Sequence, residues 1–381
     1  MLKHLSHNQQ SLYKVYHDLG AKISNTVDLL FEDRDGSFNK NTFTALVSSK
    51  FNCLHLPDSN SGKKISAIET SVAYLALGDS CLNNGLAFSV GAQAFSVNVP
   101  LFKYGSNSIK SKFLESSIKG EIIIASAITE KESGSDAYNM KTTAVKSGNE
   151  YVLNGSKYYI TNAPIADYFL VYAFTDVQKG SIGGLSAFLV DAKEKGVEII
   201  GPLEKMGLRT AQMGGINLNN VRAICIIGEE GSGTAMFNEA MTWERTVLSA
   251  LNLGIITRVT KQVQKFGELN YRGGKRLIEQ SDYNEVLNKA DIFLSEAWMK
   301  INEAAIALDE NSKQSFLKAS VAKAFVAENG ERVIRQLQQS TGAYGYLSEN
   351  VIERDYRDFL AFTIYSGSQY VQNKIISSFS R

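Results

Sequence analysis

The chain has 381 residues, of which 44% are hydrophobic and 21% charged, with 40 basic against 39 acidic side chains. This composition excludes a disordered chain. The formal net charge of +1 also excludes a protein dedicated to nucleic-acid binding, because it gives no global field that attracts an anionic polymer. No window approaches the ~18 apolar residues of a membrane span. We expect two or three domains around a large core, with neither nucleic acid nor a membrane as partner.

Cysteine and histidine are too sparse to indicate metal or thiol chemistry. The three cysteines are widely spaced and form no CxxC pair, so neither a disulfide framework nor a thiolate zinc site is expected. All four histidines lie in the first 55 residues, and His4 and His7 are one helical turn apart, a spacing that suits either a shared metal or a solvated helix. The solvated helix is the commoner case, so we expect no metal and favour an organic cofactor. The amino terminus lacks the apolar stretch of a signal peptide, which favours a cytoplasmic protein.

Three zones follow one another along the chain. The first, to about residue 120, predicts helices, because apolar residues recur at spacings of three and four. The second, to about residue 230, has short runs rich in β-branched and aromatic residues, which predict strands. The third returns to the helical period in long segments. This order indicates a mostly helical α+β protein and not an alternating βαβ fold.

Six runs in the second zone are expected as strands, namely 122–129, 151–153, 157–160, 168–174, 186–190 and 197–200. Asn154-Gly155 separates the second run from the third. Both of these residues tolerate positive φ, so the pair predicts a hairpin turn between two antiparallel strands.

The first motif with chemical content follows the first expected strand. Residues 127–136 read AITEKESGSD, with hydroxyls at Thr129 and Ser135 beside Gly134. Such a loop is either a cradle in which N–H and hydroxyl groups converge on an anion or ligand, or a surface turn capped by Ser and Asp. The surface turn is commoner, so this motif alone does not decide the function.

Four further segments occur in a fixed order: 154–162 (NGSKYYITN), 339–346 (QSTGAYGY), 353–358 (ERDYRD) and 364–368 (IYSGS). With these segments the chain resembles the acyl-CoA dehydrogenase family, in which they recur in this order and at similar spacing. The resemblance implies an amino-terminal α-helical domain (1–121), a small middle β domain (122–230) and a carboxy-terminal four-helix bundle (231–381) around FAD. The zones found from periodicity agree with it.

The resemblance also implies which residues meet the flavin. Ile128 and Thr129 would face the ring, with Thr129 serving its pyrimidine edge. Thr161 would lie near flavin N5, the hydride-accepting atom. Tyr159 takes the place of an aromatic residue, usually Trp, that packs against the flavin. Gly134 and Ser135 would meet the FAD pyrophosphate or the pantetheine arm of the substrate.

A second set of positions is implied to reach the FAD of a neighbouring subunit, so a homodimer or homotetramer is expected. Gln339 and Gly342 match such positions, and Ser368 matches a threonine near the adenosine half of FAD. The family's Arg-x-x-Phe-Gly stretch is replaced by YRGGKRL at 271–277, in which Arg272 or Lys275 is the candidate substitute. The family's Gly-Gly pair is Gly342-Ala343.

The catalytic base is where the chain departs from most of the family. Many members carry a glutamate in a Tyr-Glu-Gly-Thr segment, but residues 365–368 read YSGS, and a serine does not remove an α-proton at neutral pH. A branch that includes isovaleryl-CoA dehydrogenase carries its glutamate on a helix in a Leu-Glu-Arg context. Trp243-Glu244-Arg245 matches that context, which implies Glu244 as the base.

The helical pattern supports this choice independently. Glu244 falls on an apolar stripe, three residues after Met241 and four before Leu248. A buried carboxylate is costly unless it is paired or poised for function, and burial raises its pKa toward the range of a general base. The alternative is a structural ion pair with an arginine of another helix.

The context of Glu244 together with Tyr-Ser-Gly is similar to family members that oxidise acyl or aminoacyl groups tethered to an acyl or peptidyl carrier protein in natural-product biosynthesis. That similarity implies Ser135, Arg245 and Tyr365 on the substrate side, and an electron-transferring flavoprotein or oxygen as electron acceptor. The alternatives are a dehydrogenase of a free short- or branched-chain CoA thioester, a monooxygenase on the same fold, and a non-catalytic FAD-binding or interaction protein.

Overall fold

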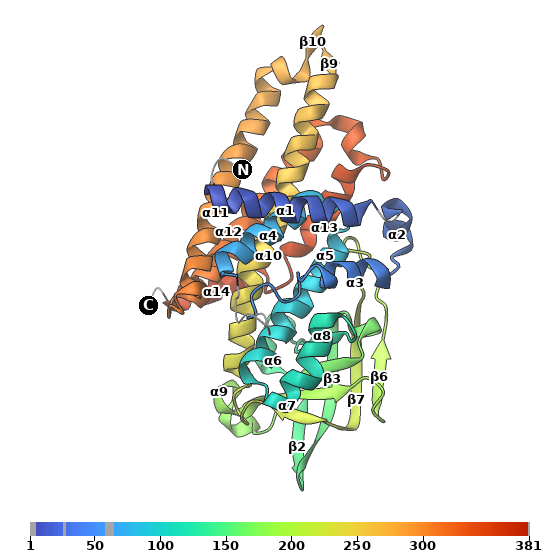
Figure 1. Ribbon diagram of the computed structural model, residues 1–381, viewed down its shortest axis with the longest axis vertical. Coiled ribbons are helices and arrows are strands. Elements are labelled where there is room, and N and C mark those ends of the chain that lie inside the picture. The colour runs from blue at the N-terminus through green and yellow to red at the C-terminus, as the bar shows by residue number, and fades with distance from the viewer. Residues whose placement is uncertain (1–4, 26–27, 58–64, 380–381) are drawn as a thin grey trace.

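The computed structural model describes residues 5–25, 28–57 and 65–379, so His4 of the histidine pair lies outside the described residues. A β domain lies at one end of the molecule, and helices from both ends of the chain form the rest (Figure 1). The expected mostly helical α+β fold is confirmed.

The amino-terminal helices begin at residues that cap them. In α1 and α4 a capping box forms: the serine hydroxyl before the helix accepts a backbone N–H, and Gln9 or Glu69 bonds back to the serine N–H. The helical elements of this part are α1 (His7–Ser24), α2 (Leu29–Asp35), α3 (Lys40–Ser48), α4 (Ala67–Ser80), α5 (Asn84–Gln93), the π-helical segment η2 (Ala94–Asn98), α6 (Val99–Tyr104), α7 (Asn107–Ile109), the π-helical segment η3 (Lys110–Leu114) and α8 (Glu115–Lys119).

The continuous segment α5–η2–α6 is long and apolar enough to cross a membrane by length and composition, which the sequence analysis did not foresee. In the most apolar part of the segment, 89% of the residues are buried inside the protein. The segment is therefore built as a core helix.

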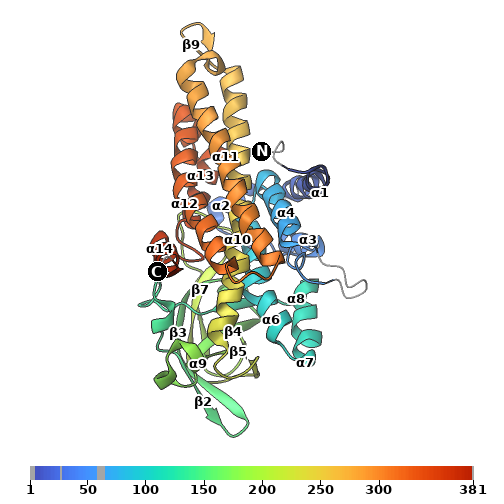
Figure 2. The same ribbon diagram turned by 90° about the vertical axis from the view of Figure 1, so that its left-hand side faces the viewer.

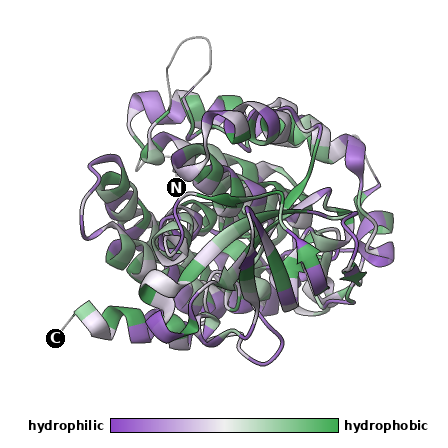
Figure 3. Ribbon diagram, turned by 90° about the horizontal axis from the view of Figure 1, so that it is seen from below, coloured by the Kyte–Doolittle hydropathy of each residue, from purple (hydrophilic) through white to green (hydrophobic). Residues whose placement is uncertain are grey.

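Eight strands of the described chain form one sheet in the order β6-β7-β3-β2-β4-β5-β8, with β1 pairing in parallel with β4. Seen from the sheet end, hydrophobic strands lie in the interior and hydrophilic segments lie in the outer loops (Figure 3). The strands are β1 (Ile124–Ala127), β2 (Thr143–Ser147), β3 (Glu150–Thr161), β4 (Tyr168–Phe174), β5 (Leu185–Asp191), β6 (Val197–Ile200), β7 (Met213–Arg222) and β8 (Cys225–Ile227).

The prediction of a hairpin turn at Asn154-Gly155 is wrong. The two runs around it are one strand, β3, and its register against β7 shifts between Leu153 and Gly155, as in a β-bulge. Gly155 is required because a Cβ there would lie 2.7 Å from the Cα of Thr142, so the glycine allows a close backbone approach instead of a reversal.

The carboxy-terminal helices stand upright side by side (Figure 2), and the longest, α10, runs from the β domain to the far end of the molecule. A two-stranded hairpin, β9 (Tyr271–Arg272) and β10 (Lys275–Arg276), connects it to α11. The helices are α10 (Gly233–Leu269), α11 (Ser281–Asp309), α12 (Ser315–Ser340), α13 (Val351–Phe362) and α14 (Gln369–Phe379), and a short helix, α9 (Ser181–Gly184), lies in the β domain.

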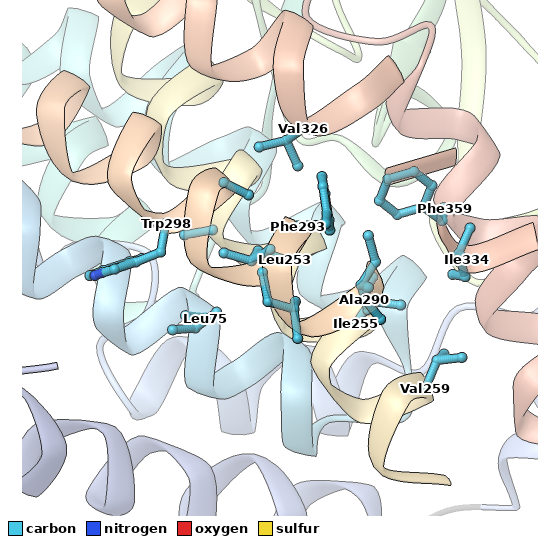
Figure 4. Close-up of a cluster of buried hydrophobic side chains, with 14 of the residues drawn as sticks. Leu75, Leu253, Ile255, Val259, Ala290, Phe293, Trp298, Val326, Ile334 and Phe359 are labelled. Atoms are coloured by element: carbon cyan, nitrogen blue, oxygen red, sulfur yellow. The ribbon is translucent and has the colours of Figure 1, made fainter. Parts of the chain in front are cut away.

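One core joins the amino-terminal and carboxy-terminal helices. Figure 4 shows aromatic and branched side chains of α4, α10, α11, α12 and α13 meeting in it, among them Leu75, Leu253, Phe293, Val326 and Phe359. Helices α4 and α10 cross closely because glycines lie at the crossing: a Cβ on Gly254 would lie 2.7 Å from the backbone nitrogen of Asp79. This close crossing fixes α10, and with it Glu244, relative to α4.

Candidate functional site

Glu244 lies in the first third of α10, where its side chain faces the protein interior and is 6% exposed. Its carboxylate accepts hydrogen bonds from the hydroxyls of Ser96 and Ser366. These serines come from η2 and from the loop between α13 and α14, so three distant segments of the chain meet at one carboxylate. The two hydroxyls hold it in a fixed orientation.

The electrostatics of Glu244 suit a proton acceptor. Burial raises the pKa of its carboxyl above the ordinary value, and the two serine hydroxyls and Arg245 partly oppose that rise. The hydrogen-bond partners of this carboxylate are hydroxyls. Within the described chain no cation makes a salt bridge to it. The expected alternative, a structural ion pair, is therefore not what the described residues form.

The π-helical segment η2 places Ser96, and the sequence explains the π geometry. Pro100 has no N–H to donate to the carbonyl of Ser96, as the α-helical pattern requires. A proline inside a helix removes one backbone donor, and a π-helical turn is one way in which a helix accommodates such an interruption. Sequence reasoning missed Ser96, although a proline inside an apolar helix was a signal that the helix is irregular there.

The loop that carries Ser366 has two consecutive residues with positive φ, Ser366 at 56° and Gly367 at 95°. Arg245 Nε donates to the carbonyl of Ser366 at 3.0 Å, and Lys323 Nζ donates to the carbonyl of Gly367 at 2.6 Å. Gln372 Nε2 donates to both carbonyls, at 3.0 and 2.9 Å. Side chains from α10, α12 and α14 thus fix this strained loop.

Two of the expected substrate residues already have partners inside the protein. Besides its bond to the loop, Arg245 donates to the Ser320 hydroxyl at 3.0 Å, and burial lowers its pKa to about 10. The Tyr365 hydroxyl accepts from Asn252 at 2.7 Å, and its ring lies 4.3 Å from that of Phe88. Both residues therefore shape the surroundings of Glu244, and direct contact with a substrate stays a prediction.

On the sheet side, three expected flavin residues lie close together. The backbone N–H of Tyr158 in β3 donates to the carbonyl of Thr129 at 2.8 Å, which joins the loop after β1 to this strand. The register of β3 shifts again between Lys157 and Ile160, and Tyr159 takes a φ of 59° with half of its surface exposed. The irregularity turns a large aromatic ring outward next to Thr129 and Thr161.

A buried ion pair supports this loop from below. Lys157 is fully buried, and its Nζ donates to the carbonyl of Ile128 at 2.8 Å and to Glu130 Oε1 at 3.1 Å. Burial lowers the pKa of Lys157 to about 8, although Glu130 acts in the opposite direction. Burial alone would raise the pKa of Glu130, but Lys157, the Thr142 hydroxyl and two backbone N–H groups hold it below its ordinary value.

The loop after Glu130 has the features of a ligand-binding segment. A Cβ on Gly134 would meet no atom within 4 Å, and Ser135 is exposed. The neighbouring Ser133 hydroxyl is buried, and no group of the described chain hydrogen-bonds it. Open space over exposed hydroxyl and backbone groups, with a buried hydroxyl left unsatisfied, fits the polar and phosphate parts of a nucleotide cofactor such as FAD.

The second expected set lies far from this loop. Tyr344, two residues after Gly342, stacks on Phe266 with ring centroids 4.8 Å apart, and Phe266 follows Glu244 on α10 by 22 residues, or roughly 33 Å of helix at about 1.5 Å per residue. Gln339 and Gly342 are exposed at this end. One chain does not bring this set together with Thr129.

The last two expected cofactor residues are placed as follows. Arg272 lies in the hairpin β9–β10, at the end of the molecule opposite the sheet (Figure 1), and donates to Asp282 at 2.6 Å. Ser368 lies in the loop at the start of α14, next to the Ser366–Gly367 pair. Whether either meets FAD stays a prediction.

Comparison with known proteins matches two parts of the chain to family models. The model described as acyl-CoA dehydrogenase, middle domain, matches residues 125–221, and the model described as acyl-CoA dehydrogenase, C-terminal domain, matches residues 231–380.

Several relatives and solved structures are similar over nearly the whole chain, among them the following three. An L-prolyl-peptidyl-carrier-protein dehydrogenase from a Serratia species is 29% identical over 98% of this chain and 96% of its own. The crystal structure of the prolyl acyl carrier protein oxidase AnaB superimposes with a TM-score of 0.94 at 30% identity and covers 99% of each chain. A structure of PigA with FAD and proline superimposes with a TM-score of 0.92 at 27% identity, over 99% of this chain and 98% of that one.

Proposed function

Because the chain belongs to the acyl-CoA dehydrogenase family, we propose that it dehydrogenates an acyl or aminoacyl thioester carried by an acyl or peptidyl carrier protein, with Glu244 as the base. It is an FAD-dependent oxidoreductase of that family. The observation that carries our proposal is a buried carboxylate on α10, held by two hydroxyls and without a salt-bridge partner in the described chain.

In this mechanism Glu244 accepts the α-proton of the thioester. Its raised pKa makes it a stronger base than an exposed carboxylate, and the hydroxyls of Ser96 and Ser366 keep the charged form oriented before the reaction. Both hydroxyls can turn away as the carboxyl takes the proton. The burial of Glu244 keeps its carboxylate away from bulk water, which strengthens every interaction at this group. When bound, FAD supplies the acceptor for the hydride that leaves the β-position.

Thr129, Tyr159, Thr161 and the loop with Gly134 and Ser135 are the residues we propose to hold this FAD. Gln339, Gly342 and Arg272 are exposed and lie at the other end of α10. Their position supports the proposal that they serve the cofactor of a second copy of the chain, in a homodimer or homotetramer. We further propose that the electron acceptor is an electron-transferring flavoprotein or oxygen and that the protein is cytoplasmic. The proposed domain boundaries lie after residues 121 and 230.

The choice of a carrier protein over free CoA rests on the similarity to the Serratia enzyme and to AnaB, whose names specify a prolyl group on a carrier protein. The test is anaerobic flavin bleaching with prolyl carrier protein, other aminoacyl carrier proteins, prolyl-CoA and short-chain acyl-CoA. We expect a carrier-bound aminoacyl group to bleach the flavin fastest. Faster bleaching by an acyl-CoA would assign the free thioester instead, and no bleaching by any thioester would leave a non-catalytic flavoprotein.

The base is tested in the same assay. Glu244→Gln keeps the shape but accepts no proton, so flavin reduction should slow by roughly 10² or more with unchanged FAD content. The matched control is Glu239→Gln on the same helix, because Glu239 is partly exposed and pairs with Lys103 at 2.5 Å. Full activity of Glu244→Gln would refute the assignment.

A further inference from the structure

Lys323 is a buried cation close to the site that the proposed mechanism does not use. It lies on α12 with its side chain fully buried, and its Nζ donates to the carbonyl of Gly367 at 2.6 Å. The same Nζ lies 5.3 Å from the centre of the Phe362 ring. The Gly367 carbonyl and the Phe362 ring are thus the contacts of this ammonium group. In the described chain no carboxylate makes a salt bridge to it.

Such a cation is expensive for the fold. Burial, together with the nearby positive charge of Arg245, lowers the pKa of Lys323 to about 7. An uncharged chain of the same length would fill this position without the cost of desolvating an ammonium group. The lysine therefore contributes something that packing alone does not require.

Its hydrogen bond is made to the loop that holds the base. Gly367 follows Ser366, and both have positive φ, a conformation that costs a non-glycine residue such as Ser366 free energy unless the surroundings enforce it. Arg245 donates to the carbonyl of Ser366 and Lys323 to that of Gly367, and Gln372 donates to both. With both carbonyls fixed, the Ser366 side chain points to Glu244 and donates its hydroxyl hydrogen.

The contacts link Lys323 to Glu244 through this loop, because Lys323 donates to the carbonyl of Gly367 and the neighbouring Ser366 hydroxyl donates to the carboxylate. Ser366, Ser96 and Arg245 oppose the effect of burial on the Glu244 carboxyl, and Lys323 is not among these groups. The titratable groups around the carboxylate are Arg245 on its own helix, Tyr365 on the loop and, behind the loop, Lys323 on α12.

We propose that Lys323 is a positioning residue for the base: by holding the carbonyl of Gly367, it keeps the Ser366 hydroxyl on the Glu244 carboxylate. The role of Glu244 as the base is part of the proposed function, and this inference rests on that function. The hydrogen-bonded path itself exists without substrate, so it is testable on the FAD-loaded protein alone.

The experiment measures the pH midpoint of Glu244 by carbon-13 NMR of protein labelled at the glutamate carboxyl carbon, with the signal assigned by its loss in Glu244→Gln. We expect Ser366→Ala to raise the midpoint by about one pH unit, because the charged form loses a hydrogen-bond donor. Lys323→Met should raise it by a smaller amount, because Gln372 still donates to the Gly367 carbonyl. Lys323→Arg, which keeps a donor, should stay within a few tenths of a unit of the wild type.

The double variant Ser366→Ala, Lys323→Met separates the two explanations. If Lys323 acts through Ser366, the double variant shows the same midpoint as Ser366→Ala, since contributions on one path do not add. Lys318→Met is the matched control on α12, because Lys318 forms a partly exposed pair with Glu303. It should leave the midpoint unchanged.

Two results would overturn the proposal: an unchanged midpoint in Lys323→Met while Ser366→Ala shifts, or fully additive shifts in the double variant. If Lys323→Met does not fold, Lys323→Gln repeats the test. Failure of both neutral variants beside a folded Lys323→Arg would assign the lysine to stability alone and also overturn it. A wild type that no thioester bleaches would instead contradict the proposed function and leave the titration result standing.

Discussion

Replacing Lys157 by methionine tests whether the buried pair under the loop after β1 supports cofactor binding. Methionine fills the same space without charge and removes the donor to the carbonyl of Ile128. Glu130 then loses its cation but keeps three donors, the N–H groups of Lys141 and Thr142 and the Thr142 hydroxyl. The loop should loosen while the sheet below it stays intact.

Removing one partner of a buried ion pair destabilises by about 3–5 kcal/mol, and we expect about 3 kcal/mol here because the remaining donors partly compensate Glu130. At about 2.1 cal/mol/K of unfolding entropy per residue, the 381 residues give roughly 0.8 kcal/mol/K, so the melting midpoint should fall by roughly 4 °C. The measurement is differential scanning fluorimetry of the FAD-loaded protein. The ratio of flavin to protein absorbance, measured in parallel, should fall as well.

The double variant Lys157→Met, Glu130→Gln is the decisive comparison. A neutral pair no longer leaves a buried charge uncompensated, so its midpoint should recover most of the loss. The matched control is Lys141→Met, because the pair of Lys141 with Glu132 is 80% exposed on both sides and should leave the midpoint unchanged. If Lys157→Met melted like the wild type and retained full FAD, the pair would not support the loop.

Three further outcomes follow. Burial lowers the pKa of Lys157 to about 8, so the folded protein releases this proton near pH 8, whereas the unfolded chain keeps it to about pH 10.5. The free energy of unfolding of the wild type, relative to that of Lys157→Met, should therefore rise from pH 8 to pH 10. Denaturant titrations at several pH values measure it. Gly254→Ala should destabilise by about 1–3 kcal/mol in urea unfolding, because the new methyl group meets the backbone of α4; an unchanged midpoint would show that the two helices can separate. In the Glu244→Gln background, Ser366→Glu should restore part of the flavin reduction rate, and no gain would mean that residue 366 does not reach the α-carbon.

The sequence was sufficient for the class of fold and for the burial of Glu244, whose role as the base stays a prediction. Helical and strand periods change near residues 120 and 230, and such changes are readable because each element buries one face. Glu244 was recognisable because a carboxylate interrupts an apolar stripe on a long helix. Both signals are local, and the family motifs added the order of the segments.

What the sequence did not give depends on contacts between distant residues. The register shifts in β3 come from Gly155 approaching Thr142 and from the turned-out Tyr159, and neither contact is visible from the local dipeptide that suggested a hairpin. Ser96 and Lys323 were missed for the same reason. Lys323 lies within an ordinary helical pattern, and the proline after Ser96 signals an irregular helix without indicating a partner. The role of each depends on a partner more than 40 positions away.

The position of Ser366 gives a physical reason for the serine at the place where much of the family has glutamate. Its hydroxyl meets the carboxylate of Glu244, so the loop position and the helix position converge on one point. Two carboxylates at that point would repel each other, and the pKa of one of them would rise until it stayed protonated. If the base is on the helix, as we propose, the loop needs a residue that donates to the charged form, and a hydroxyl does so at little steric cost. On our proposal, the same change makes the strained loop at 366–367, with the Arg245 and Lys323 contacts that hold it, part of what sets the pKa of Glu244.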